Sequence, residues 1–282
     1  MQFTMYTRFI PTLAERGTAN TADYAANLGF SSVEVLEITA PGHPSAIPDR
    51  ETAKTVRKIL AERGLTVACY SVGTCLYRDE AAVKSLKYQA EIAAELGSPF
   101  LHHTLLSWLK KPDDAPTFEE ALENVTDAAA KVADYAAPLG VTCLYEDQGL
   151  YANGVDGFGR FYREIKNRTK NVGVCGDVGN TLFVDDSPVP FFEAYIDEIR
   201  HVHIKDYLIK TGGNCPGIYW LPTNGGNWVR DTMIGHGNVD IAACMAILKK
   251  AGYNGALAFE NEHPEPYEAG VKQGMDYLRR FM

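Results

Sequence analysis

Short apolar runs alternate with longer alanine-rich stretches along the whole chain. Eight runs are rich in β-branched and aromatic residues, and they span residues 2–9, 31–38, 65–72, 99–106, 141–147, 171–178, 200–206 and 255–262. Their length and composition predict buried strands. The stretches between them carry apolar residues at helical spacing. Several of these stretches end in a glycine just before the next strand, at positions 29, 64, 97, 140 and 252. This is the chemistry of a loop from a helix to a strand.

Strands that alternate with helices predict βαβ units and a parallel sheet. Eight such units in 282 residues predict a single (β/α)8 TIM barrel, with residues 1–282 as one domain. An open dinucleotide-binding sheet is not favoured, because no G-x-G-x-x-G follows the first strand. Residues 212–238 are rich in Gly, Asn and Trp, and we expect a long loop there, after the seventh strand.

Composition narrows the possible partners. Hydrophobic residues make up 46% and the formal net charge is −9, which argues against a nucleic-acid binder because such proteins carry a basic footprint. The sequence has neither a run of 18 apolar residues nor a signal-like start, so no membrane partner is expected. Its six scattered cysteines form no CxxC pair. They predict free thiols in the reducing cytoplasm rather than a zinc cluster.

Polar residues end four neighbouring strands of the predicted barrel: Glu146, Asp177, His203 and Glu260. Taken alone, a carboxylate after a strand is often a helix N-cap. However, the carboxyl ends of barrel strands are where chemistry gathers, and four chargeable groups buried there would be costly without a cation or mutual pairing. Three carboxylates and one imidazole suit Mn²⁺, Mg²⁺ or Co²⁺, with Zn²⁺ also in range. The joint pattern therefore predicts one divalent metal ion.

Four segments, LYEDQG, GVCGDVGN, HVHIKD and LAFENEHP, resemble the ligand-bearing strand ends of the xylose isomerase-like TIM-barrel superfamily. This group includes sugar (phosphate) isomerases and epimerases, inosose dehydratases and ketose 3-epimerases. The resemblance follows nearly the whole chain and is strongest over residues 141–263. It implies that Glu146, Asp177, His203 and Glu260 bind the metal, with Mn²⁺ the favoured ion. It also implies a small sugar or sugar-derived substrate, and a homodimer or homotetramer.

The chain departs from the ketose 3-epimerase pattern at two places. Asn180 stands three residues after Asp177, where those enzymes have a histidine. Lys205, Asp206 and Tyr207 follow His203, where those enzymes have a glutamate and an arginine. The Lys-Asp pair is more similar to the broader isomerase group and the inosose dehydratases.

The HVHIKD segment has a period of two. Alternation places His201, His203 and Lys205 on the face that points into the barrel. The three then lie at increasing height. We expect His201 in the core, His203 on the metal and Lys205 beside the substrate.

Five further residues are candidates for substrate contact: His103, Arg8, Trp108, Glu37 and His236. His103 is preferred over His102, since alternation lets only one of this pair face the barrel mouth. Trp108 is placed to stack on a sugar ring, and Arg8 to hold a carboxylate or a phosphate. Glu37 ends the second strand, and His236 lies in a glycine-rich loop that is expected to close over the site. Packing, ion pairing or simple exposure would account for each of them equally well.

The candidate chemistry is proton abstraction next to a sugar carbonyl, with an enediolate intermediate. Glu146 and Glu260 come from non-adjacent strands, so they can act as acid and base on opposite faces of the substrate, with Lys205 as a helper. Isomerisation or epimerisation follows. Elimination by a keto-sugar or inosose dehydratase, or by a β-eliminating lyase, is the alternative. A multi-metal endonuclease and a non-catalytic sugar-binding module fit the residues less well.

Overall fold

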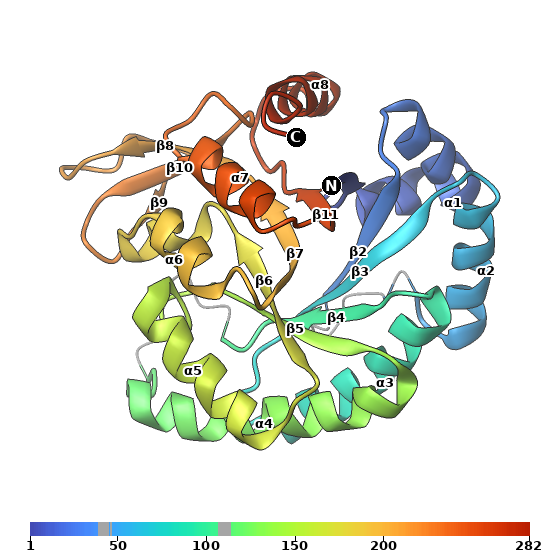
Figure 1. Cartoon of the computed structure of the whole chain (residues 1–282), viewed down its shortest axis with the longest axis horizontal. Helices are drawn as coiled ribbons and strands as arrows, with labels where there is room; N and C mark the ends of the chain where they lie inside the picture. The colour runs from blue at the N-terminus through green and yellow to red at the C-terminus, as the bar shows by residue number, and fades with distance from the viewer. Residues whose placement is uncertain (39–44, 46, 107–113) are drawn as a thin grey trace.

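A closed barrel of parallel strands forms the centre of the computed structural model, which describes residues 1–38, 45, 47–106 and 114–282 (Figure 1). Neighbouring strands pair in parallel throughout the barrel. The barrel strands are β1 (Gln2–Met5), β2 (Ser32–Ile38), β3 (Thr66–Gly73), β4 (Phe100–His103), β5 (Thr142–Glu146), β6 (Val172–Asp177), β7 (Ile199–Ile204) and β11 (Ala256–Phe259). Each strand lies inside one of the eight predicted runs or extends beyond it by one residue. The predicted (β/α)8 barrel is confirmed.

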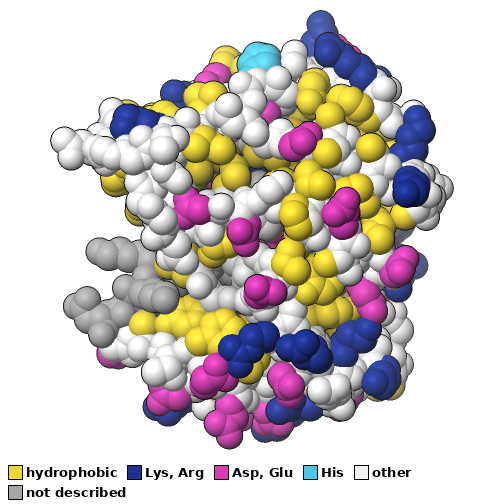
Figure 2. Space-filling view, turned by 60° about the vertical axis from the view of Figure 1, so that its left-hand side comes forward, with side chains coloured by type: hydrophobic (Ala, Val, Ile, Leu, Met, Phe, Trp, Pro, Cys, Tyr) yellow, Lys and Arg dark blue, Asp and Glu magenta, His cyan; other side chains and the backbone are white. Residues whose placement is uncertain are grey.

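Along the described residues, eight α-helices cover the outside of the barrel (Figure 1). They are α1 (Phe9–Asn27), α2 (Arg50–Ala61), α3 (Glu80–Leu96), α4 (Phe118–Ala136), α5 (Gly154–Arg168), α6 (Pro188–Tyr195), α7 (Ile241–Lys250) and α8 (Tyr267–Leu278). Their ends follow local chemistry. Thr117 and Glu120 form a capping box at the start of α4. Gly97 ends α3 with φ of 73°, a left-handed conformation that favours glycine. Acidic and basic side chains are interspersed over the face shown in Figure 2.

The hydrophobic core has two parts. Successive side chains along each strand point alternately outward, toward the helices, and inward, into the barrel. Outward-facing side chains such as Val202 and Ile204 are fully buried in the large cluster between barrel and helices. A small cluster of Cys69, Leu144 and Cys175 lies apart from it. All six cysteines are free, and burial raises the thiol pKa of the four that are fully buried. Among the described helices, none is both long and apolar enough to cross a membrane.

The segment after β7 is more ordered than its composition predicts. It forms an antiparallel sheet in the order β8-β10-β9, from β8 (Asp206–Lys210), β10 (Trp228–Thr232) and β9 (Leu221–Pro222). The expectation of a loop throughout 212–238 is therefore corrected, because β10 finds its partner some twenty residues earlier in the chain, which composition does not show. The Asp206 carboxylate anchors the return by accepting hydrogen bonds from backbone N–H groups of Gly235, Gly237 and Val239.

Candidate metal centre

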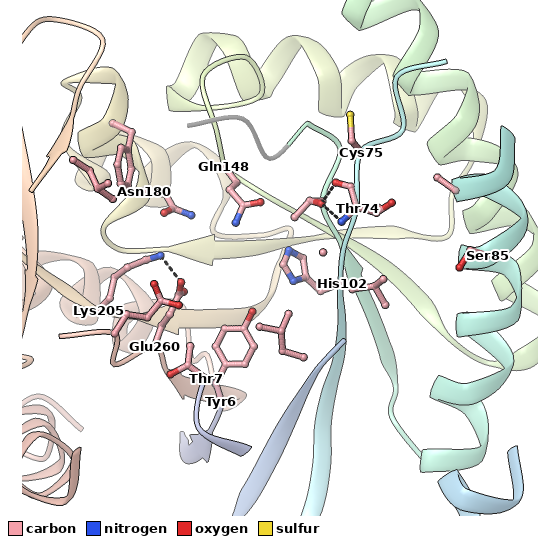
Figure 3. A pocket seen from close by; sticks show the side chains of 18 of the residues that line it. Tyr6, Thr7, Thr74, Cys75, Ser85, His102, Gln148, Asn180, Lys205 and Glu260 are labelled. Carbon is pink, nitrogen blue, oxygen red and sulfur yellow. Dashed lines mark hydrogen bonds and ion pairs between the residues drawn. The ribbon is translucent and has the colours of Figure 1, made fainter. Parts of the chain in front are cut away.

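A cavity of about 910 Å³ opens at the carboxyl ends of the barrel strands (Figure 3). Side chains from several strands and loops point into it, including Tyr6, His102, Asn180, Lys205 and Glu260. A volume of this size is typical of small-molecule sites. The cavity lies at the end of the barrel where the sequence predicts chemistry.

The four predicted metal ligands lie together at this cavity. Glu146, Asp177, His203 and Glu260 each offer one ligand atom, and these atoms are all within 4.8 Å of one another. Nδ1 of His203 is 2.9 Å from Oε1 of Glu146, 3.6 Å from Oε2 of Glu260 and 3.9 Å from Oδ2 of Asp177. Only the Glu260 side chain is appreciably exposed, at 15%. The group can hold one metal ion.

Strand register explains why these residues meet. Asp177 on β6 is level with His203 on β7, and His203 is level with Ala258 on β11. One Asp177 oxygen is occupied, since Oδ1 accepts hydrogen bonds from the backbone N–H groups of Gly179 and Asn180, both at 2.7 Å. Oδ2 is left to face the cluster. Asp177 therefore caps the following turn with one oxygen and offers the other as a ligand.

Beneath the cluster lies a carboxylate that the sequence analysis missed. Glu34 on β2 is fully buried, and it accepts from Nε2 of His201 at 2.7 Å, from Nε2 of His203 at 3.1 Å and from the Ser71 hydroxyl. Its bond to Nε2 of His203 turns Nδ1 toward the other carboxylates, as outer carboxylates do for metal-binding histidines. The available signal was a glutamate in the middle of the apolar run SSVEVLEI.

His102 and Tyr6 complete this inner layer. Nδ1 of His102 is 3.1 Å from the Ser71 hydroxyl, and its Nε2 is 3.3 Å from Oε2 of Glu146. The Tyr6 ring stacks on the His203 ring with centroids 4.6 Å apart. Together these contacts fix the positions of His203 and Glu146 from several strands.

Burial and neighbouring charges shift the pKa values of Asp177, Glu146 and His203 in different directions. Burial raises the pKa of Asp177 to about 7, helped by Glu260 and Glu146 and opposed by Lys205. Burial also acts on Glu146, but His203 and His102 outweigh it and hold the pKa of that carboxyl well below its usual value. Burial opposes protonation of His203, yet Cys175 and the Glu34 and Glu146 carboxylates raise its pKa well above the usual range.

Lys205 lies at the height that alternation predicts. Its Nζ is 2.9 Å from Oε1 of Glu260 and 3.1 Å from Oδ2 of Asp177. Burial disfavours its charge, but these two carboxylates raise the pKa of Lys205 well above its ordinary value. Among the protein's own groups, the carboxylates therefore outweigh burial.

Comparison with known proteins identifies the barrel. Residues 22–281 match the model of the xylose isomerase-like TIM barrel family. The chain belongs to this family. The resemblance drawn from the four strand ends is thereby confirmed.

Two enzymes are similar to this chain in sequence. An inosose dehydratase of Geobacillus thermodenitrificans (strain NG80-2) is 23% identical over 253 residues, which covers 80% of each chain. A ketose 3-epimerase of Arthrobacter globiformis is 27% identical over 223 residues, which covers 74% of this chain and 68% of that protein. The solved structure of the IOLI protein with a bound zinc atom is similar in fold, with a TM-score of 0.71 and 16% identity over 100% of this chain and 99% of that chain.

Three residues that depart from the ketose 3-epimerase pattern, Asn180, Asp206 and Tyr207, have different roles in this barrel. Nδ2 of Asn180 donates to Oε1 of Glu146 at 3.1 Å, so the amide holds a carboxylate of the cluster. Asp206 anchors the loop at 234–239 and does not line the cavity. Tyr207 is buried against the edge of Phe183 and lines the cavity wall.

The predicted orientation of the two adjacent histidines is wrong. His103 is fully buried beside Tyr145, whose hydroxyl donates to α4, and the ring centroids are 5.1 Å apart. Burial lowers the pKa of His103 to about 3. His102 faces the cavity instead. Apolar residues flank this pair on both sides, so alternation gives the period of β4 but not its phase.

The other candidates for substrate contact lie away from the described wall of the main cavity. The Glu37 carboxylate accepts from the Ser45 hydroxyl at 2.6 Å and from the Ile47 N–H at 3.2 Å, which ties these two residues to the end of β2. His236 is exposed on its loop. Arg8 is exposed, with its guanidinium 5.6 Å from the Tyr267 ring centre, and it lines a smaller neighbouring cavity. Trp108 lies outside the described residues.

Proposed function

We propose that this protein is a divalent-metal-dependent enzyme that isomerises or epimerises a small sugar by removing a proton next to a carbonyl. The observation that carries the proposal is the meeting of three carboxylates and one imidazole, from four adjacent strands, beside a cavity of sugar-binding size. The family, and the enzymes among its similar members, support this class of reaction.

The donor set fits a divalent ion. Three carboxylates and the Nδ1 atom of His203 are hard to borderline ligands, which suit Mn²⁺ best in our reading and also Mg²⁺, Co²⁺ or Zn²⁺. The three carboxylates carry more negative charge than the ammonium group of Lys205, which pairs with two of them, can neutralise. The cluster therefore attracts a cation. When bound, such an ion supplies Lewis acidity toward the substrate carbonyl and a neighbouring hydroxyl.

Glu146 and Glu260 are the proposed acid and base. They approach His203 Nδ1 from β5 and from the end of β11, so a substrate above the cluster presents different faces to them. One takes the proton next to the carbonyl, and the other returns a proton to the enediolate. Lys205 forms an ion pair with Glu260 and is placed to hold a substrate oxygen or to share its proton.

Elimination is the second candidate. It begins with the same proton removal and ends with loss of water, or of another group, from a keto-sugar or inosose. The match to an inosose dehydratase over 80% of both chains favours it. So does Asn180, which stands where ketose 3-epimerases have a histidine. Mass spectrometry separates the two reactions, because an isomer keeps the substrate's mass.

The test uses Glu146→Gln and Glu260→Gln proteins, with Glu37→Gln as a matched control whose carboxylate lies outside the cavity. Each is saturated with Mn²⁺ and assayed on a panel of ketoses, aldoses and inososes in deuterated water. We expect solvent deuterium in the wild-type and control products and a loss of turnover of about a hundredfold or more in the two cluster variants. Full turnover by both cluster variants, with metal bound, would overturn the acid–base assignment.

A further inference from the structure

A second, smaller cavity of about 340 Å³ adjoins the candidate metal centre. It lies between the ends of β1 and β11 and the start of α8. Thr7 and Glu262 line both cavities, so the two share a wall. The smaller one is still within the size range of a small-molecule site.

This cavity holds buried polar groups that the fold leaves unused. The Asn261 side chain is 6% exposed, and neither Oδ1 nor Nδ2 has a hydrogen-bond partner among the described residues. The Tyr267 hydroxyl, on a side chain 8% exposed, also lacks one in the described part of the chain. Buried polar groups are normally satisfied, because leaving them unpaired is costly. Two such side chains on one cavity wall indicate a place for a hydrogen-bonding ligand.

The backbone holds these groups in position. The Asn261 N–H donates to the Thr7 hydroxyl at 3.2 Å, which ties the end of β11 to the end of β1. The Arg8 guanidinium lies over the Tyr267 ring, with 5.6 Å to the ring centre. The Asn261 backbone and the Tyr267 ring are therefore held at the cavity wall.

The lining has no excess of positive charge that would favour an anion. Arg8 and Glu262 contribute one charge of each sign, and Oε1 of Glu265 is paired with Arg230 at 3.2 Å. The unused groups include both donors and acceptors, as Asn261 Nδ2 donates, its Oδ1 accepts, and the Tyr267 hydroxyl does either. Sugar hydroxyls also do both. An uncharged, polyhydroxylated group complements this wall better than a carboxylate or phosphate does.

We propose that Asn261 and Tyr267 form a second sugar-binding subsite, which takes the distal sugar unit of a substrate whose reacting unit lies at the metal cluster. The substrate is then a disaccharide or a glycoside rather than a free monosaccharide. This proposal rests on the proposed function, and it adds the class of substrate. The distal sugar unit forms hydrogen bonds with Asn261 and Tyr267. The glycosidic linkage between the two units passes Thr7 and Glu262, which line both cavities.

The test compares the binding of D-fructose with that of four keto-disaccharides, turanose, maltulose, lactulose and isomaltulose, to Mn²⁺-loaded protein by titration calorimetry. We expect at least one disaccharide to bind wild type about tenfold more tightly than fructose. Asn261→Ala and Tyr267→Phe should each remove about three- to tenfold of that advantage and leave fructose binding unchanged, since each removes hydrogen bonds to the distal unit alone. Tyr24→Phe, which removes a hydroxyl that contacts Glu268 on α8, is the matched control and keeps the advantage.

Each result is decisive. If no disaccharide binds more tightly than fructose, or if the advantage survives in the Asn261→Ala, Tyr267→Phe double variant, the subsite is overturned. If disaccharides bind and lose affinity in the double variant, but no sugar in the panel is turned over, the subsite stands and the proposed reaction fails. Absence of binding by every sugar overturns both.

Discussion

The two halves of the barrel contribute to the candidate site in different ways. β5, β6, β7 and the end of β11 supply Glu146, Asp177, His203 and Glu260, whose ligand atoms lie within 4.8 Å of one another, and Glu260 lines the cavity. β2, β3 and β4 contribute Glu34, Ser71 and His102, which support those groups from inside the barrel. The C-terminal half offers ligand atoms, and the N-terminal half holds the ligands in place.

This difference has a physical consequence. Glu34 is a carboxylate with no exposure to solvent, a placement that is costly unless its oxygens are satisfied. Two histidines and a serine satisfy them, so the cost stays low only while those partners are present. The supporting half therefore orients His203, and damage to it should weaken the metal centre without removing a ligand.

The largest effect is expected from the ligand half. Asp177→Asn removes one charged ligand and leaves a side chain of similar shape. We expect turnover to fall by roughly a thousandfold, because a metal Lewis acid supplies several kcal/mol to such a reaction. Steady-state kinetics with measured metal content checks this. Unchanged turnover with one ion bound would show that Asp177 is no ligand.

A smaller effect is expected from the supporting half. Glu34→Gln keeps the volume of the side chain but cannot hold Nε2 of His203 in the same way, so we expect metal affinity to fall about 10- to 100-fold. Competition with a fluorescent chelator measures it. Glu37→Gln, on the same strand but turned away from the cavity, is the control. Equal affinities in the two variants would contradict the assigned role of Glu34.

The acidity of the ligand half should make metal binding depend on pH. Metal binding needs Asp177 deprotonated and His203 neutral, and the pKa of Asp177 is about 7 while that of His203 is raised well above its usual value. Protons therefore compete with the metal, and affinity should rise with pH. From pH 6 to pH 7 we expect a gain of about tenfold to a hundredfold, because His203 and much of Asp177 are protonated in this range and binding releases between one and two protons. Calorimetry in two buffers counts the protons, and a pH-independent affinity would refute the competition.

The smallest difference is expected between the two adjacent histidines of β4. His102→Gln changes a group 3.3 Å from Glu146, so kcat should fall about tenfold while the fold stays intact. His103→Gln changes a side chain packed against Tyr145, so it should lower the free energy of unfolding by about 1–3 kcal/mol and leave kcat nearly unchanged. Thermal unfolding and kinetics together check the pair. The reverse pattern would restore His103 as the cavity residue.

The same division explains what the sequence could predict. The strands and the four strand-end residues were predictable, because buried runs and alternation are local properties and register brings strand ends level. Glu34 was missed, since only contacts with His201 and His203, far along the chain, give it a role. His102 and His103 were exchanged because the phase of β4 depends on packing with its neighbours. β10 was missed because its pairing with β8 is made across a long, glycine-rich segment.

One structure would test the central proposal most directly: a crystal structure of the Mn²⁺-loaded protein, with the ion located by anomalous scattering. The account predicts one ion, bonded at about 2.0–2.3 Å to one atom each from Glu146, Asp177, Glu260 and His203, with Nδ1 as the histidine ligand. Two other buried groups among the described residues could hold an ion: Glu34, His201 and His203, and Glu146, Cys175 and His203. An ion held by either of them instead would contradict the account. So would a cluster that stays empty at saturating Mn²⁺.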